Sequence, residues 1–131
     1  MNYDLELDSK NQTIKAKVTC LLNQDLRKEI LFAVANQLGI TGFSRVVIDL
    51  TESTFNLDEP MVGAFDLTNF MRSLGIKPHV KFAFIYSDAE SHRKYFENIA
   101  QFDGFNRQYF KSLSTAATWL KTIDAQSPSE N

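Results

Sequence analysis

The sequence predicts an α/β domain with a mostly parallel five-stranded sheet, an N-terminal antiparallel hairpin and four helices. Three observations predict it. The N-terminus alternates apolar and polar residues, the apolar runs 45–50 and 81–86 scarcely alternate, and helical spacing fills the segments between strands. The resulting order, β-β-α-β-α-β-α-β-α, favours right-handed crossovers with helices on the faces of the sheet.

The hairpin is predicted from two period-two patterns on either side of the polar turn 9–12. The apolar positions are Tyr3, Leu5 and Leu7 before the turn, and Ile14, Ala16 and Val18 after it. Because one side of each strand is polar, the pair suits the edge of a sheet. The runs 45–50 and 81–86 are typical of strands covered on both faces, and the first of them is expected to be central and parallel.

The first helix is predicted to begin after Asn23, which can act as its N-cap, and to stop at Gly39 in the left-handed conformation. Its apolar stripe is expected to be Leu26, Ile30, Val34 and Leu38.

Two more helices are predicted from their starts. Asp58 can cap a helix that has Pro60 in its first turn and ends before Gly75. The sequence from Ser87 to Glu90 has the S-x-x-E form of a capping box, and a helix is expected to follow through Phe102.

A short strand over 107–110 and a last helix capped by Ser112 complete the predicted domain. The residues expected to face inward from that helix are Leu113, Ala116, Ala117, Leu120 and Ile123. One domain is therefore expected over 1–123, followed by a polar, disordered tail over 124–131.

Composition excludes several classes of function. The 131 residues carry a formal charge of -2 with mixed signs, which gives no reason to expect a nucleic-acid partner. Cys20 is the only cysteine, which fits a reducing compartment such as the cytoplasm. The N-terminus lacks the features of a signal peptide, and no apolar run approaches the ~20 residues of a transmembrane helix.

The element order, the strand that leads into DLTESTFNLDEPMVG and the closing Tyr109-Phe110 and Trp119-Leu120 resemble the STAS fold of anti-sigma factor antagonists. The closer resemblance is to the SpoIIAA-like family, whose members often end in an aromatic strand and a helix with Ala and Trp-Leu. It covers about residues 3–123 and implies a regulatory, non-enzymatic protein-interaction module.

In the antagonists, the loop after the central strand carries an Asp-Ser-Ser-Gly type signature whose serine is phosphorylated to switch binding. Asp58 matches that signature, but Glu59 and Pro60 stand where serines would be and offer no hydroxyl. The resemblance therefore implies a partner-binding surface without the phosphorylation switch. Glu59 is interpreted first as a stabilising charge in the first turn of a helix.

Polar residues after two neighbouring strands are the candidate partner- or ligand-binding residues, because the carboxyl ends of strands collect ligands in open α/β sheets. Ser87 and Asp88, after the second strand, should approach the loop that follows the first. The candidates in that loop and the helix it starts are Thr51, Ser53, Thr54, Asp58, Glu59 and Val62. The alternative is that these groups only satisfy turns and helix caps.

Phe102 and Phe105 are further candidates, because they flank Asp103-Gly104 in a predicted loop and are the members of the aromatic segment 95–110 expected to be exposed. Most of that segment is interpreted as core. The run from His92 to Lys94 is interpreted as a solvated helix face, and the spacing of His79 and His92 predicts no metal site.

Two functions remain after these steps. The first is binding of a protein partner through the 51–63 edge. The alternative is a carrier or sensor of a small apolar or lipid-like ligand, which is implied by the architecture that the SpoIIAA-like family shares with CRAL-TRIO lipid carriers and favoured by eleven phenylalanines. No enzymatic or cofactor motif is present, so no cofactor is expected, and the exposed edge of the hairpin also permits a homodimer.

Overall fold

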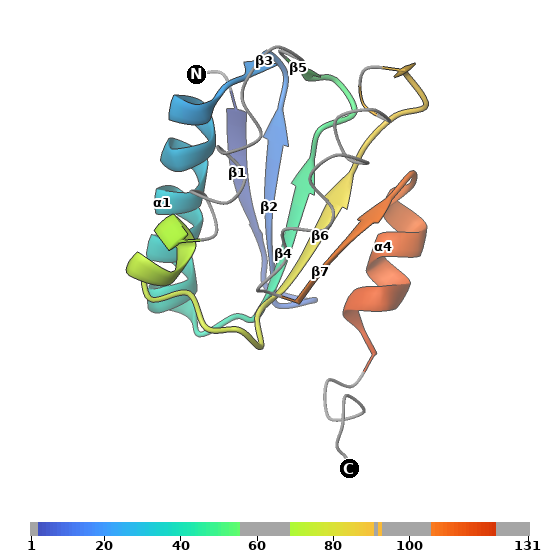
Figure 1. Ribbon diagram of the computed structural model, residues 1–131. Helices are drawn as coiled ribbons and strands as arrows, with labels where there is room; N and C mark the ends of the chain where they lie inside the picture. Colours follow the sequence, from blue (N-terminus) through green and yellow to red (C-terminus); the bar gives the residue numbers. More distant parts are fainter. Residues whose placement is uncertain (1–2, 56–68, 91, 93–105, 123–131) are drawn as a thin grey trace.

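The computed structural model describes residues 3–55, 69–90, 92 and 106–122. A five-stranded sheet in the order β1-β2-β4-β6-β7 forms its centre (Figure 1). The antiparallel pair β1 (Tyr3–Asp8) and β2 (Thr13–Val18) forms one edge. The parallel strands β4 (Arg45–Asp49), β6 (Lys81–Ile85) and β7 (Asn106–Phe110) follow. The expected hairpin, the central parallel strand and the mixed sheet are confirmed.

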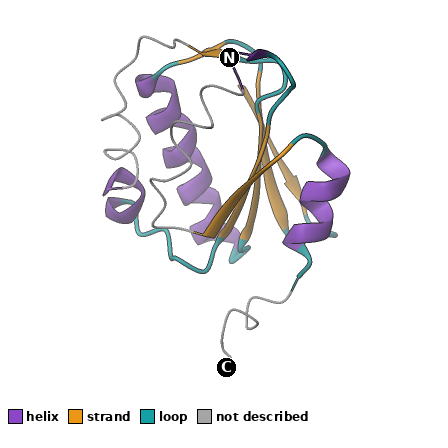
Figure 2. Ribbon diagram, turned by 45° about the vertical axis from the view of Figure 1, so that its right-hand side comes forward, coloured by secondary structure: helices purple, strands orange, loops and turns teal. Residues whose placement is uncertain are grey.

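Helices cover the two faces of this sheet. The helix α1 (Gln24–Thr41) lies on one face, together with helical residues 69–73, and α4 (Leu113–Leu120) lies on the other (Figures 1 and 2). Glu90 and His92 are also helical. The expected number of four helices depends in part on residues outside the described ones.

The main core lies between α1 and the sheet. The pairing register aligns Ile14 with Val46 and Val46 with Phe82, so one apolar row crosses three strands. All three side chains are fully buried. From α1, the buried apolar residues are Leu26, Ile30, Leu31 and Val34. The apolar residues at period-two spacing in the strands and at helical spacing in α1 thus pack together in one hydrophobic layer.

The α4 face has a smaller apolar cluster over β4 and β6. Its buried members are Val47, Ala83, Ile85, Ala116 and Leu120. Leu113, which was expected to face inward, is 47% exposed, so that expectation is wrong. It is the first residue of an eight-residue helix, and the buried stripe begins one turn later at Ala116.

Two predicted helix ends need correction. The helix α1 does not stop at Gly39 but continues to Thr41, and Gly42 supplies the left-handed cap with a φ of 75°. The Gly42 amide donates to the Leu38 carbonyl at 2.9 Å, which satisfies a carbonyl of the last turn. Glycine at 39 is tolerated in the helix at a cost of about 1 kcal/mol relative to alanine.

The proposed capping box at Ser87 is also wrong in register. Glu90 is the first helical residue rather than the third, and the Ser87 hydroxyl accepts from the Ala89 amide at 3.1 Å. The caps at Asn23 and Ser112 are confirmed, and the predicted cap at Asp58 lies outside the described residues. Asn23 accepts from the Leu26 amide at 2.8 Å, and Ser112 accepts from the Thr115 amide at 3.3 Å.

A second, two-stranded sheet was not predicted. Here β3 (Leu21–Leu22) pairs in parallel with β5 (Thr54–Phe55), beyond the carboxyl ends of β2 and β4. Two-residue strands are too short to show a periodic pattern, so they cannot be predicted from apolar spacing. Cys20 precedes β3 and is half-buried.

Candidate functional site at the carboxyl edge of the sheet

The loop that follows β4 is held by its own polar side chains. Asp49 Oδ1 accepts from the Thr51 amide at 3.0 Å and from its hydroxyl at 2.7 Å. The Ser53 hydroxyl donates to the Leu50 carbonyl at 2.9 Å, and Ser53 is buried. Thr51 and Ser53 therefore act first as turn residues, as the alternative interpretation expected.

Neighbouring strands hold the same loop from two sides. The Leu50 amide donates to the Ile85 carbonyl of β6 at 2.8 Å, and the Thr54 amide donates to the Cys20 carbonyl at 3.2 Å. The β3–β5 pairing continues from that second bond. As a result, the Thr54 side chain is exposed, while its backbone is held by hydrogen bonds on the β3 side.

His92 joins this loop to the one that follows β6. Its Nε2 lies 2.8 Å from the Ser53 carbonyl oxygen, and its Nδ1 lies 3.1 Å from the Ser87 amide. The ring is only 3% exposed and meets the Phe55 ring edge-on at 4.7 Å. The interpretation of this position as a solvated helix face is wrong, because the imidazole is the buried link between two loops.

The two hydrogen bonds fix the tautomer of His92. A carbonyl can only accept and a backbone amide can only donate, so Nε2 carries the proton and Nδ1 is the acceptor. The Ser87 hydroxyl also lies 3.2 Å from Nδ1. The lone pair of Nδ1 already accepts the hydrogen bond from the Ser87 amide and is not free to take the proton of the Ser87 hydroxyl. Ser87 and His92 therefore hold the two loops together, and they do not form an activated nucleophile.

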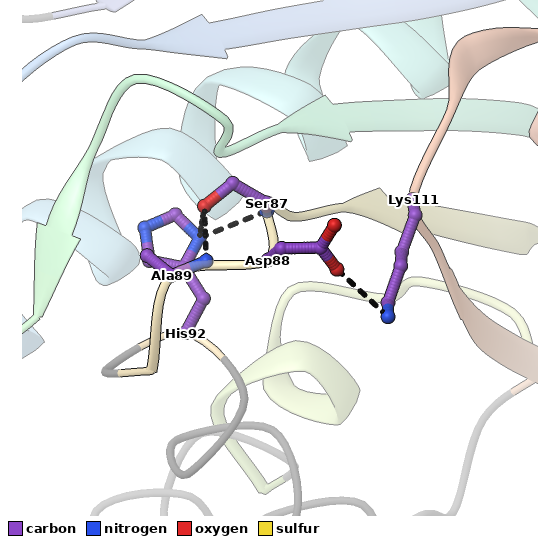
Figure 3. A network of polar contacts seen from close by, with 5 residues as sticks. All are labelled: Ser87, Asp88, Ala89, His92 and Lys111. Carbon is purple, nitrogen blue, oxygen red and sulfur yellow. Dashed lines mark hydrogen bonds and ion pairs between the residues drawn. The ribbon is translucent and has the colours of Figure 1, made fainter.

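The rim of this edge is charged and exposed. Lys17 pairs with Glu52 at 3.2 Å, and Lys111 pairs with Asp88 at 2.8 Å. The hydrogen bond and charge of Glu52 raise the pKa of Lys17 above its ordinary value. Figure 3 shows how the turn divides its side chains, with Ser87 toward His92 and Asp88 toward Lys111.

Five of the candidate residues lie where the strand order predicted them. Thr51, Ser53 and Thr54 follow β4, Ser87 and Asp88 follow β6, and His92 connects the two groups. The other five lie outside the described residues: Asp58, Glu59, Val62, Phe102 and Phe105. His92 itself was missed, because a buried histidine beside Arg93 and Lys94 has the same sequence pattern as a basic helix face.

Two further properties bear on function. In the described ranges, no group of three or more His, Cys, Asp or Glu residues could hold a metal ion. No helix among the same residues has the length and apolar character needed to cross a membrane.

Comparison with solved structures decides the fold. An anti-sigma factor antagonist from Mycobacterium paratuberculosis is similar over 92% of this chain and 93% of its own, with a TM-score of 0.61 and 12% identity. The antagonist SpoIIAA in its unphosphorylated form is similar over 92% and 97%, with a TM-score of 0.59 and 9% identity. The protein has the STAS fold of the anti-sigma factor antagonists.

A third STAS structure agrees with this result. It is a putative anti-sigma factor antagonist from Thermotoga maritima, with a TM-score of 0.60, 13% identity and coverage of 92% and 95%. No protein-family model matches the sequence, and no curated protein matches it. At these identities the shared property is the STAS fold, and function must be argued from the site.

Proposed function

We propose that this STAS domain is a non-enzymatic regulatory module of the cytoplasm that binds a protein partner at the carboxyl edge of its sheet. The observation that carries the proposal is the construction of that edge. Buried hydrogen bonds through His92 and Ser53 hold two loops in place, while Thr54 and Asp88 above them stay exposed. A preorganised, polar surface loses little conformational entropy when a partner binds.

The residues of the edge divide into two roles in this proposal. Exposed Glu52, Thr54 and Asp88 contact the partner, and Thr51, Ser53 and Ser87 hold the loops beneath them. The proposed contact surface extends to five residues that lie beyond the described ones: Asp58, Glu59, Val62, Phe102 and Phe105. We also propose that no phosphorylation switch operates at Glu59 and Pro60, since neither side chain has a hydroxyl.

Site-specific photo-crosslinking in the source cell tests the proposed surface. A photoreactive amino acid replaces Thr54 in one variant and Asp88 in a second. Lys77 gives the matched control, because it is also exposed but lies before β6, at the opposite end of the strands. The proposal expects the two edge variants to crosslink to one and the same protein and the control variant to leave it uncrosslinked.

Two outcomes would contradict the proposal. Crosslinks of equal yield from all three positions would mean that the contact is not specific to the edge, and crosslinks from Lys77 alone would place it at the other end of the sheet. Peptide mass spectrometry of the free and the crosslinked chain tests the missing switch, because a phosphopeptide of this chain from the 51–63 edge would contradict it.

A second candidate function, a carrier of a small apolar ligand, is supported by a pocket at that other end. An open pocket of about 310 Å³ lies between the end of α1 and residues 74–80. This is at the lower limit of typical ligand pockets, which are about 300–1,000 Å³. Its apolar lining includes Leu38, Phe43, Leu74, Ile76 and Val80.

Gly39 offers a direct test of this second function. It lines the pocket, and an added Cβ would meet no atom within 4 Å, so Gly39→Phe can occupy the space without backbone strain. Gly39→Ala is the matched control. Native mass spectrometry should find a co-purified ligand on the parent and the alanine variant but not on the phenylalanine variant. An unliganded parent protein would count against the carrier function.

A further inference from the structure

A second pocket, distinct from both sites above, lies on the α4 face of the sheet. It has a volume of about 140 Å³ and opens between α4 and the β1–β2 hairpin. Buried Val47 and Leu120 form its apolar floor. Lys15 from β2, Arg45 from β4 and Lys121 after α4 bring three positive charges to its lining.

The cations outnumber the carboxylates of the described lining. Asp8 is the acidic residue there, and its oxygens accept from Asn11, through the amide at 3.2 Å and Nδ2 at 2.9 Å. Its negative charge is retained and acts on Lys15. Across the described residues, no carboxylate forms an ion pair with Lys15, Arg45 or Lys121. Glu6 lies opposite Lys15 in the β1–β2 register, so the positive charge that remains around this apolar hollow is mainly that of Arg45 and Lys121.

Arg45 is already oriented within this pocket. Its Nη1 donates to the Asn11 carbonyl at 3.0 Å, which directs the guanidinium toward the hairpin turn. The remaining N–H groups form no other hydrogen bond to the described part of the chain. A guanidinium that is oriented by one bond and still has donors is well suited to a carboxylate or a phosphate.

We propose that this pocket binds a small organic anion, a carboxylate or phosphate monoester that carries a short apolar group. The charged group meets Arg45 and Lys121, and the apolar group lies on Val47 and Leu120. The volume is below the usual range of about 300–1,000 Å³, which suits a ligand smaller than a nucleotide or a lipid. Arg45 begins β4, so the pocket lies away from the carboxyl edge and is independent of the proposed partner surface.

Amide NMR titration of the full chain with three probes tests the proposal: inorganic phosphate, butyrate and n-butyl phosphate. The amide chemical-shift changes caused by n-butyl phosphate should be largest at residues 13–15, 45–47 and 120–121. An anionic head group and an apolar tail both contribute, so n-butyl phosphate should bind several-fold more tightly than inorganic phosphate. The tighter binder of butyrate and n-butyl phosphate identifies the head group as a carboxylate or a phosphate.

Charge-neutralising variants complete the test. Arg45→Gln removes a charged hydrogen-bond partner and should weaken the binding of n-butyl phosphate by about tenfold. Lys121→Gln should weaken it by a similar factor with less disturbance of the fold. Lys28→Gln removes the same charge from α1 on the other face of the sheet and should leave the affinity unchanged. Equal weakening in all three variants, no saturable shift at millimolar probe, or shifts centred elsewhere would overturn the proposal.

Discussion

The two faces of the sheet are stabilised in different ways. On the α1 face, fully buried Ile14, Val46 and Phe82 belong to one large apolar cluster. On the α4 face the apolar cluster is small, and a buried lysine, Lys81, supplies a polar attachment. One layer of this fold is therefore stabilised by buried hydrophobic area, which a sequence pattern shows. The other is stabilised partly by long-range polar contacts, which a sequence pattern does not show.

Lys81 shows what such a contact consists of. Its ammonium donates to the carbonyls of Trp119 and Thr122 at 3.1 and 2.7 Å and lies 5.1 Å from the centre of the Trp119 ring. A cation is favourable at the C-terminal end of a helix, where carbonyls lack intrahelical partners. One side chain of β6 therefore holds the end of α4 against the sheet.

The largest expected effect is on the α1 face. Phe82→Ala leaves a cavity beneath α1 and should lower the free energy of unfolding by about 3–5 kcal/mol. The matched change on the other face is Phe110→Ala, because Phe110 is half-buried and packs against Trp119 at 5.6 Å. Urea unfolding should show less than half the loss for Phe110→Ala, and equal losses would remove the contrast between the faces.

Next in size is the polar link beside Phe55, which belongs to the α1-face cluster. His92→Leu loses both hydrogen bonds and leaves the buried Ser53 carbonyl without its donor, so about 1–3 kcal/mol should be lost. His92→Gln can still donate to that carbonyl and should recover part of the loss. Amide hydrogen exchange at residues 53–54 and 87 should accelerate in the leucine variant. Unchanged exchange would contradict the role of His92 in linking the two loops.

A smaller loss is expected when the attachment of α4 is removed. Lys81→Met keeps an unbranched apolar side chain but no donor, and it should cost about 1–2 kcal/mol, because exposed Thr122 can regain water. Lys121→Met is the control, since that side chain is exposed. Urea unfolding and amide exchange within α4 measure the effect, and a Lys81→Met variant as stable as the control would contradict it.

The smallest effect belongs to Asp8 in the hairpin turn. Hydrogen bonds from the Asn11 side chain and then its amide lower the pKa of Asp8. Because the folded-state pKa is the lower one, the stabilisation is present above the ordinary carboxyl range and is lost as the pH falls through the folded-state value. An NMR titration should show the pKa of Asp8 rising toward its ordinary value in Asn11→Ala, and no change would contradict this origin.

Much of the fold could be predicted because most of its elements are long enough to show a period. The hairpin, the strand at 45–49 and the buried stripe of α1 all follow from apolar spacing. The end of α1 was misplaced because Gly39 and Gly42 are both plausible stops, and only the bond from Gly42 to Leu38 distinguishes them. Lys81 was hidden inside an apolar strand pattern.

The candidate site was predicted in its location but not in its construction. Parallel strands bring Thr51 and Ser87 to one edge, which the order of elements determines. The buried link through His92 joins residues 39 positions apart, and no local pattern reports such a contact. The short β3–β5 pairing is equally non-local and was missed for the same reason.

Amide hydrogen exchange of the full chain, alone and with the partner captured by crosslinking, tests whether a protein partner binds the carboxyl edge of this sheet. We expect added protection to be concentrated in residues 50–55 and 86–89, with little change at residues 74–80 or in α4. Protection centred on residues 74–80 or on α4, with the edge unchanged, would contradict it.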